Sequence, residues 1–463
     1  MNPSGKGLSH GLKPRHITMV SIAGVIGAGL FVGSGRAIAE AGPAALLAYA
    51  MSGLLVVLVM RMLGEMAVAQ PDTGSFSTYA DGAIGHWAGF TIGWLYWWFW
   101  VLVIPIEATA AAAILSAWLP AVPQWTFALA ITLALTGTNL FSVRNYGEFE
   151  FWFALIKVVA IVAFIAVGGL AVLGLLPGAQ VSGVSRLVDY GGFMPNGAHA
   201  VIAVVLTTMF AFMGAEIVTI AAAEAEHPAR QIVRATRSVV WRISLFYLGS
   251  IFIVVALVPW NDPLLVTHGA YQRALEILGV PHAKAIVDVI VLTAVMSCLN
   301  SALYTASRML FSLSTRGDAP SGLSRTAACG TPRAAVLVST AFAFVCVLAN
   351  YLMPERVFAF LLATSGAVAL LVYLVIAVSQ LRMRAVLERR AAELPLRMWC
   401  YPWLTWSVVV VILGVLAAMV WHPAHRMEIL ATATLLAGVL AGACQNSRSR
   451  SADGRALAMD DSP

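Results

Sequence analysis

Long apolar stretches separated by short polar connectors dominate the chain. A helix that crosses a bilayer needs about 20 mostly apolar residues. About twelve stretches of that kind occur, near 17–39, 44–69, 90–117, 125–143, 151–175, 200–222, 239–259, 284–312, 334–351, 356–379, 402–420 and 426–444. They lack the period-two alternation of apolar and polar residues that membrane β-strands show. The pattern therefore predicts an all-α integral membrane protein with about twelve transmembrane helices.

Almost no sequence remains between these stretches for a soluble domain. We expect a cytoplasmic N-terminal tail over 1–15, one transmembrane domain over 16–445 and a disordered cytoplasmic tail over 446–463, because this last segment is polar. A signal peptide is an alternative at the start, since basic residues precede an apolar run that ends in Ala37-Ile38-Ala39. The length of this run and its five glycines argue against cleavage.

Composition excludes several other classes of protein. The chain is 60% hydrophobic and only 11% charged, whereas soluble globular domains carry about 25% charged residues. A disordered chain needs low hydrophobicity and high net charge, so the transmembrane part of the sequence does not fit that class either. The five cysteines stand singly in or beside apolar stretches, from which we infer neither disulfides nor a metal site.

The basic residues predict an orientation in the membrane. With both termini in the cytoplasm, 20 Lys and Arg fall on the inner side and 6 on the outer side, while Arg61 and Lys157 lie within predicted spans. Cytoplasmic loops are enriched in Lys and Arg, which favours this orientation and an even number of spans. The net charge of +6 is thereby explained, and we expect no nucleic-acid partner.

Glycine clusters interrupt two predicted spans, the first at SIAGVIGAGLFVG (21–33) and the sixth at TMFAFMGAE (208–216). Interrupted spans at matching positions of two halves are typical of inverted-repeat transporters, whose broken helices expose backbone groups at mid-membrane. Free N–H groups at Ala28, Gly29 and Leu30 would then hold a carboxylate, and freed carbonyls would hold an ammonium. Close helix packing is an equal alternative, because the first cluster also contains a GxxxG spacing.

Ionisable residues inside spans are a second indication of function, because each costs roughly 2.5–3.5 kcal/mol at the helix centre. Glu107, Lys157 and Glu216 are of this kind. Glu216 follows the predicted break directly, which favours a role in substrate or proton handling over a polar clamp. Lys157 could instead extend to the cytoplasmic surface, and the role of Glu107 stays open. Arg61 and Glu65 have the spacing of an interfacial ion pair.

The eighth predicted span is unusually polar for a membrane helix, with the run SCLNSALYT at 297–305. Cys298, Ser301, Tyr304 and Thr305 can share one face at spacings of three and four. Lining of a transport pathway and polar contact between helices explain this face equally well.

These motifs make the chain similar to the amino acid–polyamine–organocation superfamily, and within it to proton-coupled bacterial amino acid transporters. The resemblance covers residue 16 to about 420. It rests on GVIGAGLF, LGEMAVAQPDTGSFSTYA, NYGEFEFWFALIKVVAI, FAFMGAEIVTIAAAE and NSALYTASRMLFSLSTRGDAP. The stretches YWWFWVLVIPIEATAAA, GGFMPNG and LRMWCYPWLTW look most like γ-aminobutyrate permeases.

The resemblance implies two inverted five-helix repeats, over about 16–175 and 197–380, with two further helices over about 400–445. It implies proton-coupled symport of γ-aminobutyrate by alternating access across a bacterial inner membrane, with no cofactor besides the proton gradient and no obligate protein partner. A permease for proline, β-alanine or aromatic amino acids is the alternative. An intramembrane enzyme is less favoured, because the sequence has no HExxH motif.

The resemblance also implies a binding site for the zwitterion. It comprises Val25, Ala28, Gly29, Leu30, Glu107, Phe210, Met213, Gly214 and Glu216, with Lys157 for coupling and Cys298, Ser301 and Tyr304 on the pathway. The N–H groups of Ala28 and Gly29 would bind the carboxylate, while the carbonyls of Val25, Phe210 and Met213 would face the amine. Phe210 would be an aromatic gate.

Two features are particular to this sequence. Ala28 stands where many relatives have serine, so the backbone alone must hold the carboxylate. γ-Aminobutyrate also carries its amine three methylenes from its carboxylate, so we hypothesise that Glu107 or Glu216 supplies negative potential to that distant amine. Lys157 would take the place of the sodium ion of sodium-coupled relatives, and burial would help its ammonium to release a proton.

Overall fold

The computed structural model of the chain describes residues 8, 12–31, 33–141, 143–177, 181–352, 354–389, 394–421 and 426–460. The side chains of residues 28, 206, 210, 346, 349–366, 428 and 448–460 lie outside this description. Among the described residues the structure is helical, and the β-type pairing there is one isolated bridge between Leu12 and Ala225. The prediction of an all-α membrane protein is confirmed.

The first five predicted spans all correspond to helices. The first is divided into α1 (Pro14–Ala23), α2 (Ala28–Phe31) and α3 (Gly33–Ala41), and the others are α4 (Ala45–Ala69), α6 (His86–Trp118), α7 (Gln124–Phe141) and α8 (Val143–Val172). Between them lie η1 (Gly42–Ala44) and α5 (Phe76–Ala83), and η2 (Ser185–Leu187) follows α8. The division of the first span is the feature that positions the site.

The next five predicted spans repeat this organisation. The sixth is divided into α9 (Gly197–Phe212) and α10 (Ile217–Ala223), and the others are α11 (Pro228–Arg242) continued by the π-helix η3 (Ile243–Gly249) and α12 (Ser250–Leu257), then α15 (Ala283–Thr315), α16 (Arg333–Leu352) and α17 (Pro354–Arg389). The connectors contain α13 (Leu264–His268), α14 (Ala270–Ile277) and η4 (Ser321–Ser324), and the last two spans are α18 (Trp403–Trp421) and α19 (Arg426–Asp460).

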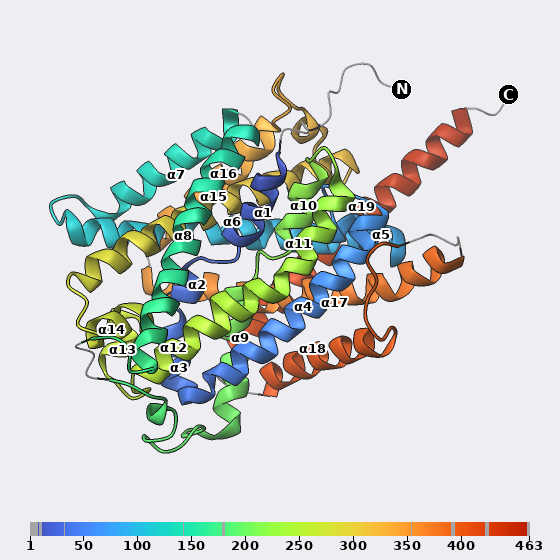
Figure 1. Cartoon of the computed structure of the whole chain (residues 1–463). Coiled ribbons are helices and arrows are strands. Elements are labelled where there is room, and N and C mark those ends of the chain that lie inside the picture. Colours follow the sequence, from blue (N-terminus) through green and yellow to red (C-terminus); the bar gives the residue numbers. More distant parts are fainter. Residues whose placement is uncertain are drawn as a thin grey trace.

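The two halves make matching contacts (Figure 1). In the first half α1 packs against α8, and in the second half α9 packs against α17. Likewise, α17 packs against α6 as α8 packs against α15, while α6 and α15 contact each other at the centre. This correspondence fits a fold of two five-helix repeats, with α18 and α19 outside them.

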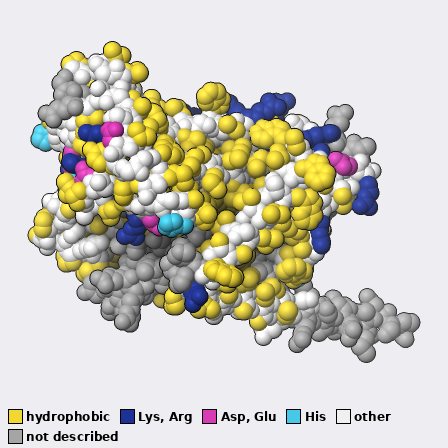
Figure 2. All heavy atoms as spheres, turned by 90° about the horizontal axis from the view of Figure 1, so that it is seen from below, with side chains coloured by type: hydrophobic (Ala, Val, Ile, Leu, Met, Phe, Trp, Pro, Cys, Tyr) yellow, Lys and Arg dark blue, Asp and Glu magenta, His cyan; other side chains and the backbone are white. Residues whose placement is uncertain are grey.

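The surface of the protein is apolar over a wide area. Figure 2 shows hydrophobic side chains across one face, with charged side chains in small groups, most of them toward its rim. Large apolar side chains such as Trp152, Trp241 and Trp421 are exposed. Eight helical segments of the described chain are long and apolar enough to cross a membrane, and shorter apolar helices lie at Gly197–Met209 and Arg333–Val345. The chain is a multi-pass membrane protein, because such a surface is stable only in lipid.

The tail differs from its predicted disorder, because α19 continues through it to Asp460. Ala, Leu, Met and Arg in this segment have high helix propensity, which the polar average of the tail conceals. α1 begins and α19 ends at the upper side of Figure 1, as an even number of spans requires.

The predicted ion pair between Arg61 and Glu65 is wrong, because both residues have other partners. Glu65 is buried, and its carboxylate accepts hydrogen bonds from Arg384 Nη1 at 2.8 Å and Gln380 Nε2 at 3.1 Å. Arg61 instead donates to the carbonyl of Arg397 at 2.7 Å. Helices α4 and α17 are thus joined by a buried charge pair that is remote in sequence.

We predict that Glu65→Ala lowers the free energy of unfolding by about 3–5 kcal/mol, because it leaves the Arg384 guanidinium buried without this carboxylate. The measurement is the thermal unfolding midpoint of the purified protein in detergent. Glu388→Ala is the matched control, since Glu388 bonds the same guanidinium from an exposed position. Equal effects of the two substitutions would contradict the prediction.

Candidate functional site

Two interruptions of helical structure meet inside the protein. The first break comprises residues 24–27, between α1 and α2, and the second break comprises residues 213–216, between α9 and α10. Gly24 and Gly214 touch where the breaks meet, because a Cβ on Gly214 would lie 2.2 Å from the Gly24 carbonyl oxygen. Gly214 also has φ +108°, a conformation that side chains disfavour. Gly214 is therefore required by this close approach, whereas a Cβ on Gly24 would meet the end of the Ile217 side chain at 2.6 Å.

Lys157 satisfies the carbonyls of the first break from α8. Its Nζ donates hydrogen bonds to the carbonyl oxygens of Ala23 at 2.7 Å and Ile26 at 3.0 Å, and to Ser297 Oγ at 2.9 Å. All three protons of the ammonium group thus have acceptors. The side chain is 0% exposed, so it does not extend to the cytoplasmic surface. The structure places this buried cation where helix α1 ends.

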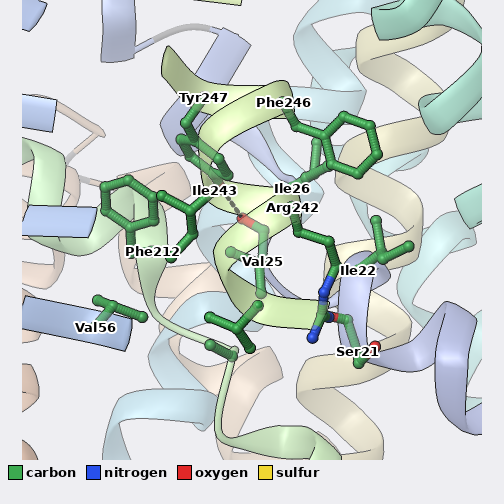
Figure 3. Close-up of a pocket in the computed structure, with 12 residues that line it drawn as sticks. Ser21, Ile22, Val25, Ile26, Val56, Phe212, Arg242, Ile243, Phe246 and Tyr247 are labelled. Carbon is green, nitrogen blue, oxygen red and sulfur yellow. Dashed lines mark hydrogen bonds between the residues drawn. The ribbon is translucent and has the colours of Figure 1, made fainter. Parts of the chain in front are cut away.

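Tyr247 links the two broken helices. Its hydroxyl lies 2.9 Å from the carbonyl oxygen of Val25 in the first break and 2.7 Å from that of Ala211 in α9. Figure 3 shows this side chain and its bond to Val25 beside a small cavity under the breaks. Tyr247 belongs to η3, and π-helical turns occur frequently at functional sites. Sequence reasoning missed it, because one tyrosine in an apolar span carries no distinguishing signal.

Glu216 stabilises the second break. Its carboxylate accepts the N–H of Gly214 at 3.2 and 3.1 Å and the hydroxyl of Tyr96, on α6, at 2.9 Å. The side chain is completely buried. The Glu216 carboxylate therefore binds the backbone of its own break and the phenol of Tyr96.

A water-sized cavity lies between the two breaks, α6 and α15. Its volume is about 20 Å³, which is enough for about one water molecule. Five predicted site residues line it, namely Val25, Gly29, Glu107, Met213 and Cys298. A Cβ on Gly27 would lie 2.9 Å from Glu107 Oε1 and 3.0 Å from Cys298 Sγ, so both side chains rest against the first break.

Other predicted site residues lie elsewhere. Ser301 and Tyr304 are buried further along α15, where Tyr304 stacks on Tyr146 with ring centroids 4.2 Å apart. Tyr304 also donates a hydrogen bond to Glu224 at 2.8 Å. The N–H of Leu30 is bonded to the Gly27 carbonyl at 3.3 Å.

The described part of the structure does not test the predicted roles of Phe210 and Ala28. The side chains of Phe210 and Ala28 lie outside the described part of the structure, so the aromatic gate at Phe210 stays a prediction. Binding of a carboxylate by the N–H groups of Ala28 and Gly29 also stays a prediction.

Comparison with known proteins decides the family. Residues 16–442 match the family model described as "Amino acid permease". The chain belongs to the amino acid permease family. Its two broken helices, its central α6–α15 contact and its apolar surface are thus those of a permease.

Relatives of this permease carry more specific names. It is 67% identical to a "Probable GABA permease" of Pseudomonas aeruginosa over 94% of this chain and 92% of the relative. It is 64% identical to a "Gamma-aminobutyric acid permease" of Escherichia coli over 94% and 93% of the two chains. The identity is 52% to a protein of the same name from Bacillus subtilis, over 95% and 94%.

We predict that Gly214→Ala lowers amino acid uptake by the permease at least about tenfold, because the new Cβ meets backbone atoms that cannot rotate away. The measurement is uptake of labelled amino acid into proteoliposomes at matched protein content. Gly169→Ala on α8 is the control, since a Cβ there meets nothing within 4 Å. Wild-type uptake by Gly214→Ala would show that the close approach is dispensable.

Proposed function

We propose that this permease imports γ-aminobutyrate together with a proton across the inner membrane by alternating access. The observation that carries the proposal is the buried Lys157 ammonium on the carbonyls of the first break, beside a cavity that Glu107 lines. The names of relatives at 52–67% identity support the choice of substrate. Both termini lie in the cytoplasm in this proposal, which the distribution of basic residues supports.

The substrate would lie between the start of α2 and α6. Its carboxylate would meet the N–H groups of Ala28 and Gly29, where aligned peptide dipoles favour negative charge. Its distant amine would then approach Glu107, which lines the cavity on α6. Glu216 is less suited to that role, because it is not among the residues that line this cavity.

Binding requires the two breaks to move apart. The cavity of about 20 Å³ holds no more than about one water molecule, and γ-aminobutyrate is far larger. Tyr247 connects Val25 with Ala211 across the breaks, so separation of the breaks must give up at least one of these bonds. A substrate ammonium that takes over a released carbonyl would stabilise the opened state, as alternating access requires.

Proton exchange at Lys157 would change the contact between α8 and α1. The charged ammonium donates to Ala23, Ile26 and Ser297, whereas a neutral amine has only two N–H groups. Loss of a proton would therefore remove one of these three bonds and leave the others without the support of a positive charge, which weakens the attachment of the first break to α8.

We predict that an inward proton gradient drives accumulation of labelled γ-aminobutyrate by wild-type proteoliposomes and that Lys157→Met abolishes this dependence, because methionine carries no exchangeable proton. Lys284→Met is the control, since Lys284 is exposed and pairs with Asp288 at the surface. The comparison is made with and without a protonophore. Gradient-driven accumulation by Lys157→Met would exclude the proposed coupling residue.

We predict that Glu107→Gln raises the apparent KM for γ-aminobutyrate about tenfold or more, since a bond between charged groups contributes about 1.5–3 kcal/mol. Glu216→Gln is expected to lower thermal stability more and KM less, because its bonds are internal to the protein. Uptake kinetics and unfolding midpoints of both variants give the comparison. A competition panel of proline, β-alanine and phenylalanine against γ-aminobutyrate tests the substrate, and stronger competition by any of these would favour the alternative cargo.

A further inference from the structure

A second fully buried carboxylate lies on α8 near the coupling lysine. Glu150 is 0% exposed and precedes Lys157 by seven residues, which puts both side chains on the same face of the helix. Its Oε2 accepts a hydrogen bond from Asn300 Nδ2 at 2.7 Å, and its Oε1 accepts one from the hydroxyl of Ser297. The transport cycle described above gives this carboxylate no role.

Ser297 connects Glu150 with Lys157. Its Oγ accepts a hydrogen bond from Lys157 Nζ at 2.9 Å and donates one to the Glu150 carboxylate. The three side chains therefore form a continuous path of ammonium, hydroxyl and carboxylate, and each of them is 0% exposed. A hydroxyl that accepts on one side and donates on the other has the arrangement that a proton relay needs.

We propose that Glu150 is the internal proton acceptor for Lys157 and that the Ser297 hydroxyl relays the proton. The N–H bond of Lys157 breaks as its proton passes to Ser297 Oγ, and the O–H proton of Ser297 passes at the same time to Glu150 Oε1. The ammonium and carboxylate become a neutral amine and a neutral carboxylic acid, while Ser297 remains a hydroxyl. This inference rests on the proposed proton coupling, and adds the residue that takes up the proton.

The neutral pair is suited to this environment. Separated charges away from water are costly, whereas a neutral amine and acid keep hydrogen bonds at a smaller desolvation penalty. The transferred proton is the one that faces Ser297, so the N–H groups that face Ala23 and Ile26 remain, but a neutral amine binds these carbonyls more weakly than an ammonium does, which weakens the contact between α8 and α1. Transfer back to Lys157 would restore that contact.

The polar side chains next to this path form hydrogen bonds or ion pairs with partners of their own. Asn300 on α15 is held by Asn139 on α7 at 2.8 Å, and Tyr146 faces Ser301 at 3.4 Å. Beyond Tyr146, the carboxylate of Glu224 is paired with Arg308 at 2.9 Å.

Helices α6, α15 and α1 place further titratable side chains near the first break and α8. Glu107 on α6 and Cys298 on α15 lie against Gly27 in the first break, and His16 packs from α1 against Gly147 at the start of α8. Glu150 is the carboxylate that the Ser297 hydroxyl reaches.

The test distinguishes proton-coupled accumulation from the exchange of substrate across the membrane. Full-length Glu150→Gln is reconstituted and assayed for gradient-driven accumulation of labelled γ-aminobutyrate and for counterflow without a gradient. We expect accumulation to fall at least about tenfold while counterflow stays within about twofold, because exchange of bound substrate needs no net proton transfer. Glu148→Gln is the matched control, since this glutamate lies on the same helix but bonds Arg15 at the surface. Wild-type accumulation by Glu150→Gln would overturn the inference.

A second pair of variants covers the case in which Glu150→Gln loses counterflow as well. Ser297→Ala removes the hydroxyl, whereas Ser297→Thr retains one. We expect the threonine variant to accumulate labelled γ-aminobutyrate under the gradient. The alanine variant should accumulate at least about tenfold less. Equal behaviour of the two, including loss in both, would overturn the relay. Wild-type protein that accumulates nothing under a proton gradient would instead reject the proposed coupling itself.

Discussion

The hydrogen-bonding demand of an interrupted helix within lipid is the constraint on which this structure depends. Backbone groups that lose their helical partners cannot turn to water there, so side chains must replace those partners. Lys157 and Tyr247 do so for the carbonyls of the first break, and Glu216 does so for the N–H of Gly214. Each of these side chains comes from a helix packed around the breaks or from the break itself. The interruptions are therefore possible only because the surrounding bundle is already in place.

The same constraint connects stability with transport. A change in a side chain that satisfies a broken helix also affects that helix, since a lost proton weakens the remaining hydrogen bonds to the carbonyls and a displaced hydroxyl removes one. The close approach of Gly24 and Gly214 lies beside these bonds and brings the two broken helices together. Movement of one break must therefore displace the other. This is the physical basis on which a substrate between them could change the arrangement of both halves.

Much of the fold follows from local sequence. Apolar length predicts the spans, and glycine-rich interruptions predict both breaks, because these properties act over a few residues. Glu65 shows where such reasoning fails, since its partner Arg384 is 319 residues away and only tertiary packing brings them together. Its near neighbour Arg61 has the better local spacing but a different partner.

The residues of the site also differ in how well the sequence predicts them. Lys157 and Glu216 stand out in the sequence, because an ionisable residue is conspicuous inside an apolar run. Glu150 does not, because it lies just before the predicted span at 151–175 and reads as part of a polar connector. The helix actually begins at Val143, and one face of the turns preceding the apolar run is buried, including Tyr146, Gly147 and Glu150. Tyr247 is hidden for the opposite reason, as one aromatic among many apolar residues.

The covalent attachment of the cation at the first break has a consequence for the conditions under which the protein works. A dissolved metal ion at such a place would come and go with the salinity of the medium. The ammonium group of Lys157 is carried by its own carbon chain, so its local concentration is the same in dilute and in concentrated salt. The occupancy of this position by a cationic side chain therefore does not depend on a free metal ion in the medium.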